Sequence, residues 1–81
     1  MFVTVRMFAR LREIAGVPEI AIEVPDGLDA RAVWDVLVER HPGLAPYGAS
    51  ISCAVNEEYA AFATRLNDGD EVAFLPPVSG G

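Results

Sequence analysis

Hydrophobic residues recur at every second position in several short segments of the chain. In the first segment Val3, Val5 and Met7 fall on one face, and the residues between them fall on the other. Such alternation, with many β-branched side chains, is typical of a strand with one buried face. The pattern predicts strands at residues 2–7, 19–24, 51–55, 59–63 and 71–75.

A short helix is predicted directly after the first strand. Phe8, Leu11, Ile14 and Ala15 recur at helical spacing, while the charged residues between them point elsewhere. Gly16 follows, and glycine commonly ends a helix.

The main helix is predicted from Ala30 to His41. Asp29 is a good N-cap residue, Val33 and Leu37 belong to a broad apolar face, and Pro42-Gly43 ends the segment. The residues after it, through Pro46 and Gly48, are predicted to form a loop.

The predicted order is strand, helix, strand, helix and then three strands, which is an α+β arrangement. A mixed five-stranded sheet would pack on the main helix, with the short helix beside it. The chain has 81 residues, enough for one small domain. We expect this domain at residues 1–75, followed by a C-terminal tail at residues 76–81.

Composition and charge exclude several kinds of partner. The formal net charge is -6, whereas nucleic-acid binding depends on clustered basic residues. No lysine is present to accept an isopeptide bond, because the basic residues are all arginine, at positions 6, 10, 12, 31, 40 and 65. Hydrophobic residues make up 52% of this short chain, so part of its surface is expected to meet a partner protein.

The expected location is the cytoplasm. No apolar run approaches the length that crosses a bilayer, and no secretory signal pattern is present. Cys53 is the single cysteine, so no internal disulfide is possible.

Few side chains are candidates for catalysis or metal binding. His41 is expected to interact with the end of the main helix, and Cys53 alternates with Ile51 and Val55 as a small buried hydrophobe. The turn at residues 67–70 lacks the spaced ligands of a calcium loop. No phosphate-binding loop or nucleophile elbow occurs. By elimination, the terminal carboxylate is the distinctive chemical group.

The chain ends in Pro76-Pro77-Val78-Ser79-Gly80-Gly81. Glycine has no Cβ, so the last residues can enter a channel that excludes other residues, and the prolines favour an extended backbone. The tail could span at most roughly 20 Å, from a root anchored in the last strand. We therefore predict that it is fed into the active site of another protein.

Three segments resemble the small, sulfur-carrying subunits of molybdopterin synthase. They are Phe8-Ala9-Arg10-Leu11-Arg12-Glu13-Ile14-Ala15-Gly16, Ala54-Val55-Asn56, and Leu66 to Gly81, which joins an Asp-Gly-Asp turn to the Pro-Pro-Val-Ser-Gly-Gly end. The layout is similar over essentially the whole chain, and it matches least at residues 44–50. The resemblance implies a ubiquitin-like β-grasp fold.

The resemblance also implies a reaction cycle. An E1-like enzyme would use ATP to adenylate the Gly81 carboxylate, and a sulfur donor would displace AMP to leave a thiocarboxylate. That sulfur would form the dithiolene of molybdopterin in a pocket of the synthase large subunit. The chain itself would bind no cofactor and would have no catalysis of its own, and the family implies two small and two large subunits.

The residues at the end of the chain would divide these tasks. Gly81 would react, Gly80 would give clearance, and Pro76, Pro77, Val78 and Ser79 would guide the tail. Phe74, Leu75 and the exposed sheet face are predicted to contact the partner. Arg10 or Arg12 is a candidate to pair with an acidic partner surface, although a solvated helix face is the simpler account.

Two other interpretations stay open at this point. The chain could be a different β-grasp carrier that serves thiazole synthesis, tRNA thiolation or protein conjugation. It could also be a plain binding domain whose tail is incidental.

Overall fold

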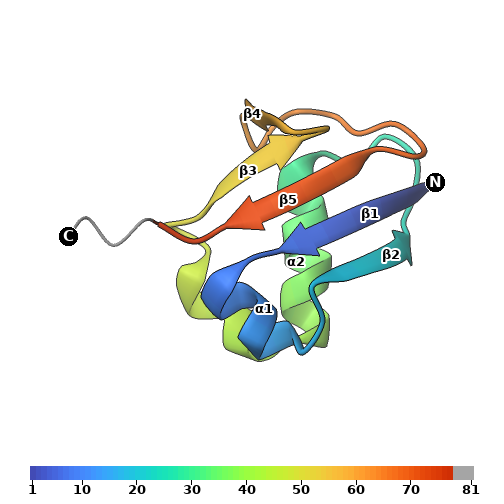
Figure 1. Cartoon of the computed structure of the whole chain (residues 1–81). Coiled ribbons are helices and arrows are strands. Elements are labelled where there is room, and N and C mark those ends of the chain that lie inside the picture. Colours follow the sequence, from blue (N-terminus) through green and yellow to red (C-terminus); the bar gives the residue numbers. More distant parts are fainter. Residues whose placement is uncertain (78–81) are drawn as a thin grey trace.

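The computed structural model describes residues 1–77, which form one sheet and a layer of helix packed against it (Figure 1). The elements are β1 (Phe2–Met7), α1 (Ala9–Ala15), β2 (Glu19–Glu23), α2 (Ala30–Arg40), the 3-10 helix η1 (Pro42–Tyr47), β3 (Ser52–Val55), β4 (Glu58–Ala60) and β5 (Glu71–Leu75). The predicted α+β class and the mixed five-stranded sheet are confirmed.

The first and last strands lie side by side within the sheet, whose order is β2-β1-β5-β3-β4. β1 and β5 are parallel, with Met7 opposite Phe74, and the other pairs are antiparallel. Because β1 and β5 run the same way, the chain leaves both strands at the same end of the sheet. Figure 1 shows α1 beneath this end, where the C-terminal segment also leaves the sheet.

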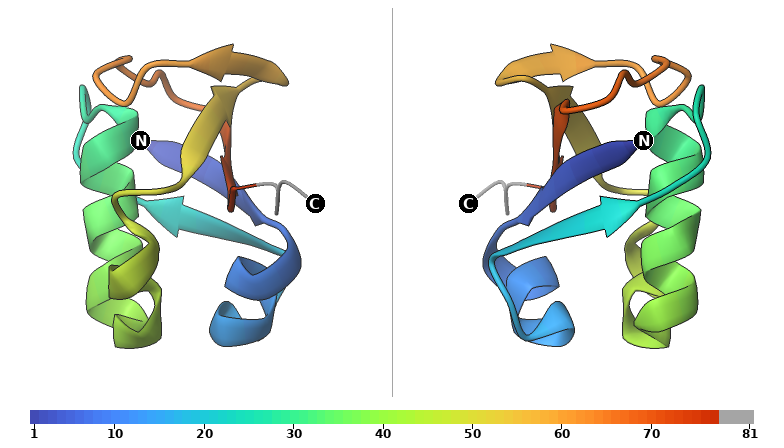
Figure 2. Two further views of the ribbon diagram at one scale, coloured as in Figure 1. Left: turned by 90° about the vertical axis from the view of Figure 1, so that its left-hand side faces the viewer. Right: turned by 90° about the vertical axis from the view of Figure 1, so that its right-hand side faces the viewer.

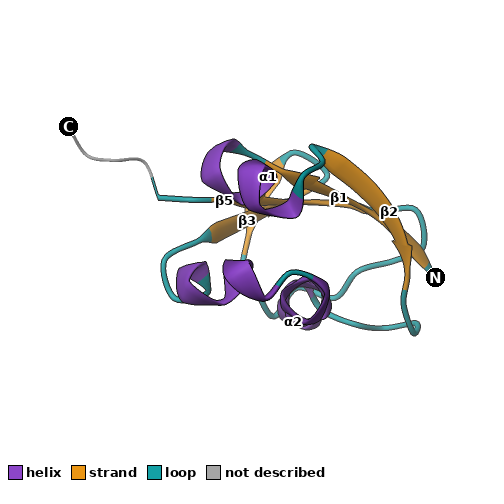
Figure 3. Cartoon of the chain, turned by 90° about the horizontal axis from the view of Figure 1, so that it is seen from below, coloured by secondary structure: helices purple, strands orange, loops and turns teal. Residues whose placement is uncertain are grey.

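The hydrophobic core lies between the sheet and α2, which covers one face of it (Figures 2 and 3). Trp34 of α2 packs edge-on against Phe74 of β5, with 5.1 Å between the ring centroids. The alternation seen in the sequence accounts for the β1 side of this core. The fully buried residues of the whole core include Val3, Val5, Met7, Leu11, Ile22, Val33, Trp34, Leu37, Leu44, Val72 and Phe74.

The N–H groups in the first turn of α2 donate hydrogen bonds to acceptors outside the helix. The first N–H groups of a helix have no partner within it. Here the Ala32 N–H donates to Asp29 Oδ1 at 2.8 Å, which confirms the predicted cap. The N–H groups of Ala30 and Arg31 donate to carbonyls of the 61–70 segment. At the other end the helix stops at Arg40, because His41 leaves the helical conformation and becomes the C-cap.

Two predictions between α2 and β5 are wrong. The loop expected after Pro42 is the 3-10 helix η1, because proline is tolerated in a first helical turn and the Leu44 side chain of this turn is fully buried. The strand expected at residues 59–63 is β4, at Glu58–Ala60. Its second half is a turn, which lets the Phe62 ring stack on Phe74 with 6.4 Å between their centroids.

The β3–β4 hairpin turns through two residues with left-handed backbone. Asn56 has a φ of 50° and Glu57 a φ of 71°, and Val55 pairs with Glu58 across the turn. Two loop residues with positive φ define a type I′ turn, whose twist matches the flanking strands.

Candidate functional site: the last strand and the root of the tail

The C-terminal tail begins from a strand that is paired on both sides. β5 is bonded to β1 and to β3, so Leu75 and the residues before it are held within the sheet. Pro76 is half-buried and Pro77 is exposed. Val78, Ser79, Gly80 and Gly81 lie outside the described residues, so their predicted roles stay predictions.

The start of β5 is fixed by a side chain from the β3–β4 turn. Asn56 Oδ1 accepts a hydrogen bond from the Glu71 N–H at 3.0 Å, and Asn56 Nδ2 donates to Asp70 Oδ1 at 3.0 Å. Asp70 Oδ2 also accepts from the Asn67 N–H at 2.7 Å. The two hydrogen bonds that Asp70 accepts lower the pKa of its carboxyl, and the bond from Asn56 lowers it most. The sequence analysis did not predict these hydrogen bonds from Asn56 to the start of β5. The feature that could have indicated them is an asparagine in a two-residue turn between strands.

Phe74 is a core residue, and its predicted contact with a partner is wrong. Its side chain is fully buried between Trp34 and Phe62. Side chains alternate along a strand, and Val72 and Phe74 point toward α2. Phe74 therefore holds the root of the tail in place from the inside.

The outward positions of β5 are Glu71, Ala73 and Leu75. They lie on the face that α2 does not cover, where Leu75 is half-buried opposite Ser52 and Ala73 lies opposite Ala54. Leu75 and the first two residues of the tail, Pro76 and Pro77, are thus accessible, and their contact with a partner stays a prediction.

Cys53 and His41, the two side chains considered as candidates for catalysis or metal binding, lie where the sequence predicted. Cys53 is buried on β3 and its thiol lies 3.2 Å from the Ala60 carbonyl oxygen, as a small core residue would. Burial raises the pKa of the Cys53 thiol, which makes it less nucleophilic. His41 lies at the end of α2, as predicted.

Within residues 1–77, no three His, Cys, Asp or Glu side chains are grouped so that they could hold a metal ion. Over the same range, no helix has the length and apolar character needed to cross a membrane. The arrangement is that of a firmly held strand whose end presents a short tail.

Comparison with known sequences gives a match over almost the whole chain. The sequence pattern of the ThiS family matches residues 5–81. The molybdopterin synthase sulfur carrier subunit of Homo sapiens is 42% identical over 82 residues, covering 98% of this chain and 93% of the relative. The subunit of the same name from Arabidopsis thaliana is 37% identical over 79 residues, covering 98% of this chain and 82% of the relative.

Comparison with solved structures gives the same fold. SAMP1 from Haloferax volcanii, a small archaeal modifier protein, matches with a TM-score of 0.87 and 32% identity over 100% of both chains. A chain in the complex of subunits 1 and 2 of the molybdopterin-converting factor from Helicobacter pylori matches with a TM-score of 0.70 and 28% identity, over 100% of both chains. These neighbours confirm the predicted ubiquitin-like β-grasp fold.

Proposed function

Because this chain belongs to the ThiS family of ubiquitin-like β-grasp proteins, we propose that it is the sulfur carrier subunit of a molybdopterin synthase. The observation that carries the proposal is its nearly full-length similarity to subunits of that name. The strand that holds the root of the tail supports it, because a carrier must present its terminus from a stable base.

The proposed chemistry takes place at the Gly81 carboxylate. A carboxylate is anionic and a poor electrophile, so it must first be activated. An E1-like enzyme would join it to the α-phosphate of ATP, forming a mixed anhydride with AMP and releasing pyrophosphate. A sulfur donor would then displace AMP and leave a thiocarboxylate, whose sulfur is a soft nucleophile. ATP is therefore used by the activating enzyme and is not bound by this chain.

The second half of the proposed cycle belongs to the synthase large subunit. Its pocket would hold the pterin precursor, and two thiocarboxylate transfers would supply the dithiolene sulfurs. Gly80 and Gly81 would pass through the narrowest part of the channel, because they have no side chains. We place the cycle in the cytoplasm, in an assembly of two small and two large subunits.

Intact mass spectrometry tests this proposal. The purified chain is mixed with a candidate activating enzyme and ATP, and we expect AMP to be attached at Gly81. With a sulfur donor present, sulfur should replace one terminal oxygen. Deleting Gly81, or adding one residue after it, should abolish both products and molybdopterin formation while circular dichroism shows an intact fold. The proposal is wrong if the chain without Gly81 still supports molybdopterin formation.

A second candidate function is that of a different ubiquitin-like carrier or a protein modifier. The structural similarity to SAMP1 favours this alternative specifically. It predicts adducts between the C-terminus of this chain and lysines of target proteins in cells, together with no binding to a synthase large subunit. The two functions are therefore separated by a pull-down followed by peptide mass spectrometry.

A further inference from the structure

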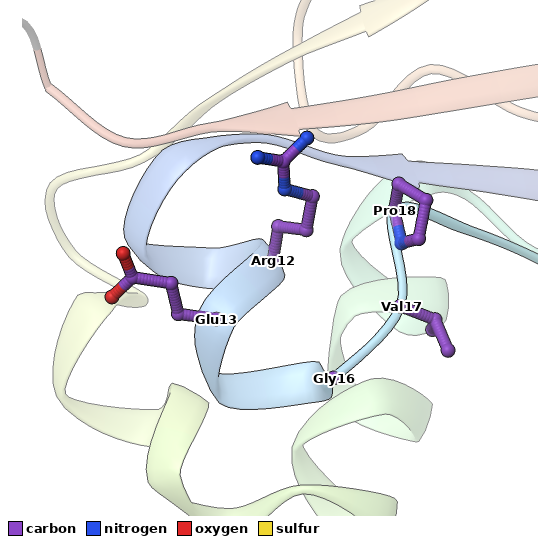
Figure 4. Close-up of a pocket in the computed structure, with 5 residues that line it drawn as sticks. All are labelled: Arg12, Glu13, Gly16, Val17 and Pro18. Carbon is purple, nitrogen blue, oxygen red and sulfur yellow. The ribbon is translucent and has the colours of Figure 1, made fainter.

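A shallow groove runs between α1 and the β1–β2 pair. It consists of two adjoining hollows, of about 360 Å³ and about 280 Å³, which share Arg12 and Pro18 in their lining. Figure 4 shows the larger hollow, with Arg12 on the helix and Pro18 on the segment that leads into β2. The Met7 N–H donates to the Pro18 carbonyl at 2.9 Å, and Leu11 is fully buried. The walls of the groove are therefore fixed to the core.

Arg12 is the cation available for pairing in this groove. Glu13 on the same helix is bound by Arg10, at 2.9 Å between Nη1 and Oε2. Arg6 lies 3.8 Å from Glu19 and 3.5 Å from Glu71. Within residues 1–77 Arg12 has no ionic partner, and its side chain is exposed. The groove thus offers a positive charge on a protein whose net charge is -6.

Apolar side chains flank this charge. Phe8 is 37% exposed and Val17 is 38% exposed, and they are among the few large hydrophobic residues that the described chain leaves open to solvent. The Arg6 guanidinium lies 5.3 Å from the centroid of the Phe8 ring, within the range of a cation–π contact. Ala9, next to Phe8, has a φ of 50°, a left-handed conformation that costs a non-glycine residue about 1–2 kcal/mol. Such strain is often kept where the backbone serves a binding site.

The groove lies at the end of the sheet from which the tail leaves. Met7 is opposite Phe74 in the parallel β1–β5 pair, so Phe8 and Pro76 each follow directly from this end. A partner that holds the tail therefore approaches the end of the sheet beside which Figure 1 shows α1, the helix that carries Arg12 of the groove.

We propose that this groove receives an acidic segment of the synthase large subunit, with a carboxylate on Arg12 and apolar side chains on Phe8 and Val17. The inference rests on the proposed function. Stable protein interfaces bury roughly 1,200–2,000 Å² in total. A tail of six residues supplies only part of such an area, so a permanent partner must also cover the body of the domain beside the tail. The acidic occupant follows from charge complementarity, because Arg12 presents an accessible positive charge there.

The test is the dissociation constant of the purified large subunit, measured by isothermal titration calorimetry with the full chain. We expect Arg12→Glu to weaken binding at least tenfold and Val17→Ser to weaken it several-fold. The matched control is Arg40→Glu, which makes the same charge change at an exposed position of α2, on the other layer of the fold (Figure 3). It should change the affinity less than twofold. The Arg12 effect should shrink at high salt, as an electrostatic contact does.

Each alternative outcome has a distinct meaning. Equal binding by wild type and Arg12→Glu, with thermal midpoints that agree, overturns the groove assignment and leaves the sulfur carrier function intact. A loss in adenylation by the activating enzyme, with unchanged binding of the large subunit, also overturns it, because the groove then serves the other partner. If the wild-type chain forms a thiocarboxylate but never binds a large subunit, both the groove assignment and the synthase role fail.

Discussion

Phe74 connects the last strand to the core, and replacing it by alanine tests that role directly. The ring is fully buried and contacts Trp34 and Phe62. Truncating a buried phenylalanine costs about 3–5 kcal/mol, through lost burial and the cavity that remains. A domain of 81 residues is expected to have a total stability of about 4–12 kcal/mol. The substitution should therefore remove between a quarter and all of the free energy of unfolding.

Urea unfolding provides the measurement. Trp34 is the single tryptophan and is 1% exposed, so its fluorescence reports on the core. Because Phe74 is also its neighbour, the transition should be followed by far-UV circular dichroism as well. Phe74→Leu keeps most of the apolar volume and should cost less than about 1.5 kcal/mol. We expect Phe74→Leu to bind the large subunit nearly as well as wild type under conditions where it is folded.

A contrary result would restore the partner contact that the sequence suggested for Phe74. If Phe74→Ala costs less than about 1 kcal/mol and the folded variant fails to bind the large subunit, the side chain cannot be part of this core.

Three smaller effects follow from the described residues. The hydrogen bonds from Asn56 and Asn67 lower the pKa of the Asp70 carboxyl, so they stabilise the fold above about pH 4 and that stability is lost as pH falls through the folded pKa. In urea titrations at pH 7, Asp70→Asn should thus be about 1 kcal/mol less stable than the wild type. This difference in the free energy of unfolding should disappear in acid, and a difference that does not change with pH would contradict the reasoning. Glu57→Gly should raise the stability by about 0.5–1 kcal/mol in thermal unfolding, because the φ of 71° suits glycine, and a loss would argue against the type I′ turn. Cys53 should react with a thiol reagent only at the rate of unfolding, because its side chain is buried; fast reaction in the native protein would show that β3 opens.

The sequence pattern predicted the strands best where alternation and turn residues agreed. β1 and β5 were predicted with the bounds they have, because each has an alternating face and a clear end, at the α1 segment and at Pro76. The cap at Asp29 was also predictable, because an aspartate just before an apolar helical repeat can accept a hydrogen bond from an N–H group only three residues later.

The misses occur where tertiary packing overrides local composition. Residues 61–63 have the apolar composition of a strand, but the chain turns after β4 and the Phe62 ring stacks on Phe74. The two prolines of η1 indicated a loop, and the burial of Leu44 that stabilises a helical turn there depends on contacts that no local pattern records. Phe74 was assigned to a partner together with Leu75 because both lie at the root of the tail, and that position in the sequence does not show that the Phe74 side chain is buried.

The distribution of charge along the sheet favours one orientation for any partner that takes the tail. The starts of β1 and β5 lie at the end away from the tail, and acidic residues gather there: Asp68 accepts the Phe2 N–H at 2.7 Å, Glu23 lies opposite Phe2, and Glu57 occupies the β3–β4 turn. Arg12 follows the end of β1, on the tail side. An acidic partner surface is thus repelled by the end away from the tail, and at the tail end Arg12 is a cation with which it can pair. Because Pro76 and Pro77 follow the other end of β5, a partner oriented in this way meets the root of the tail.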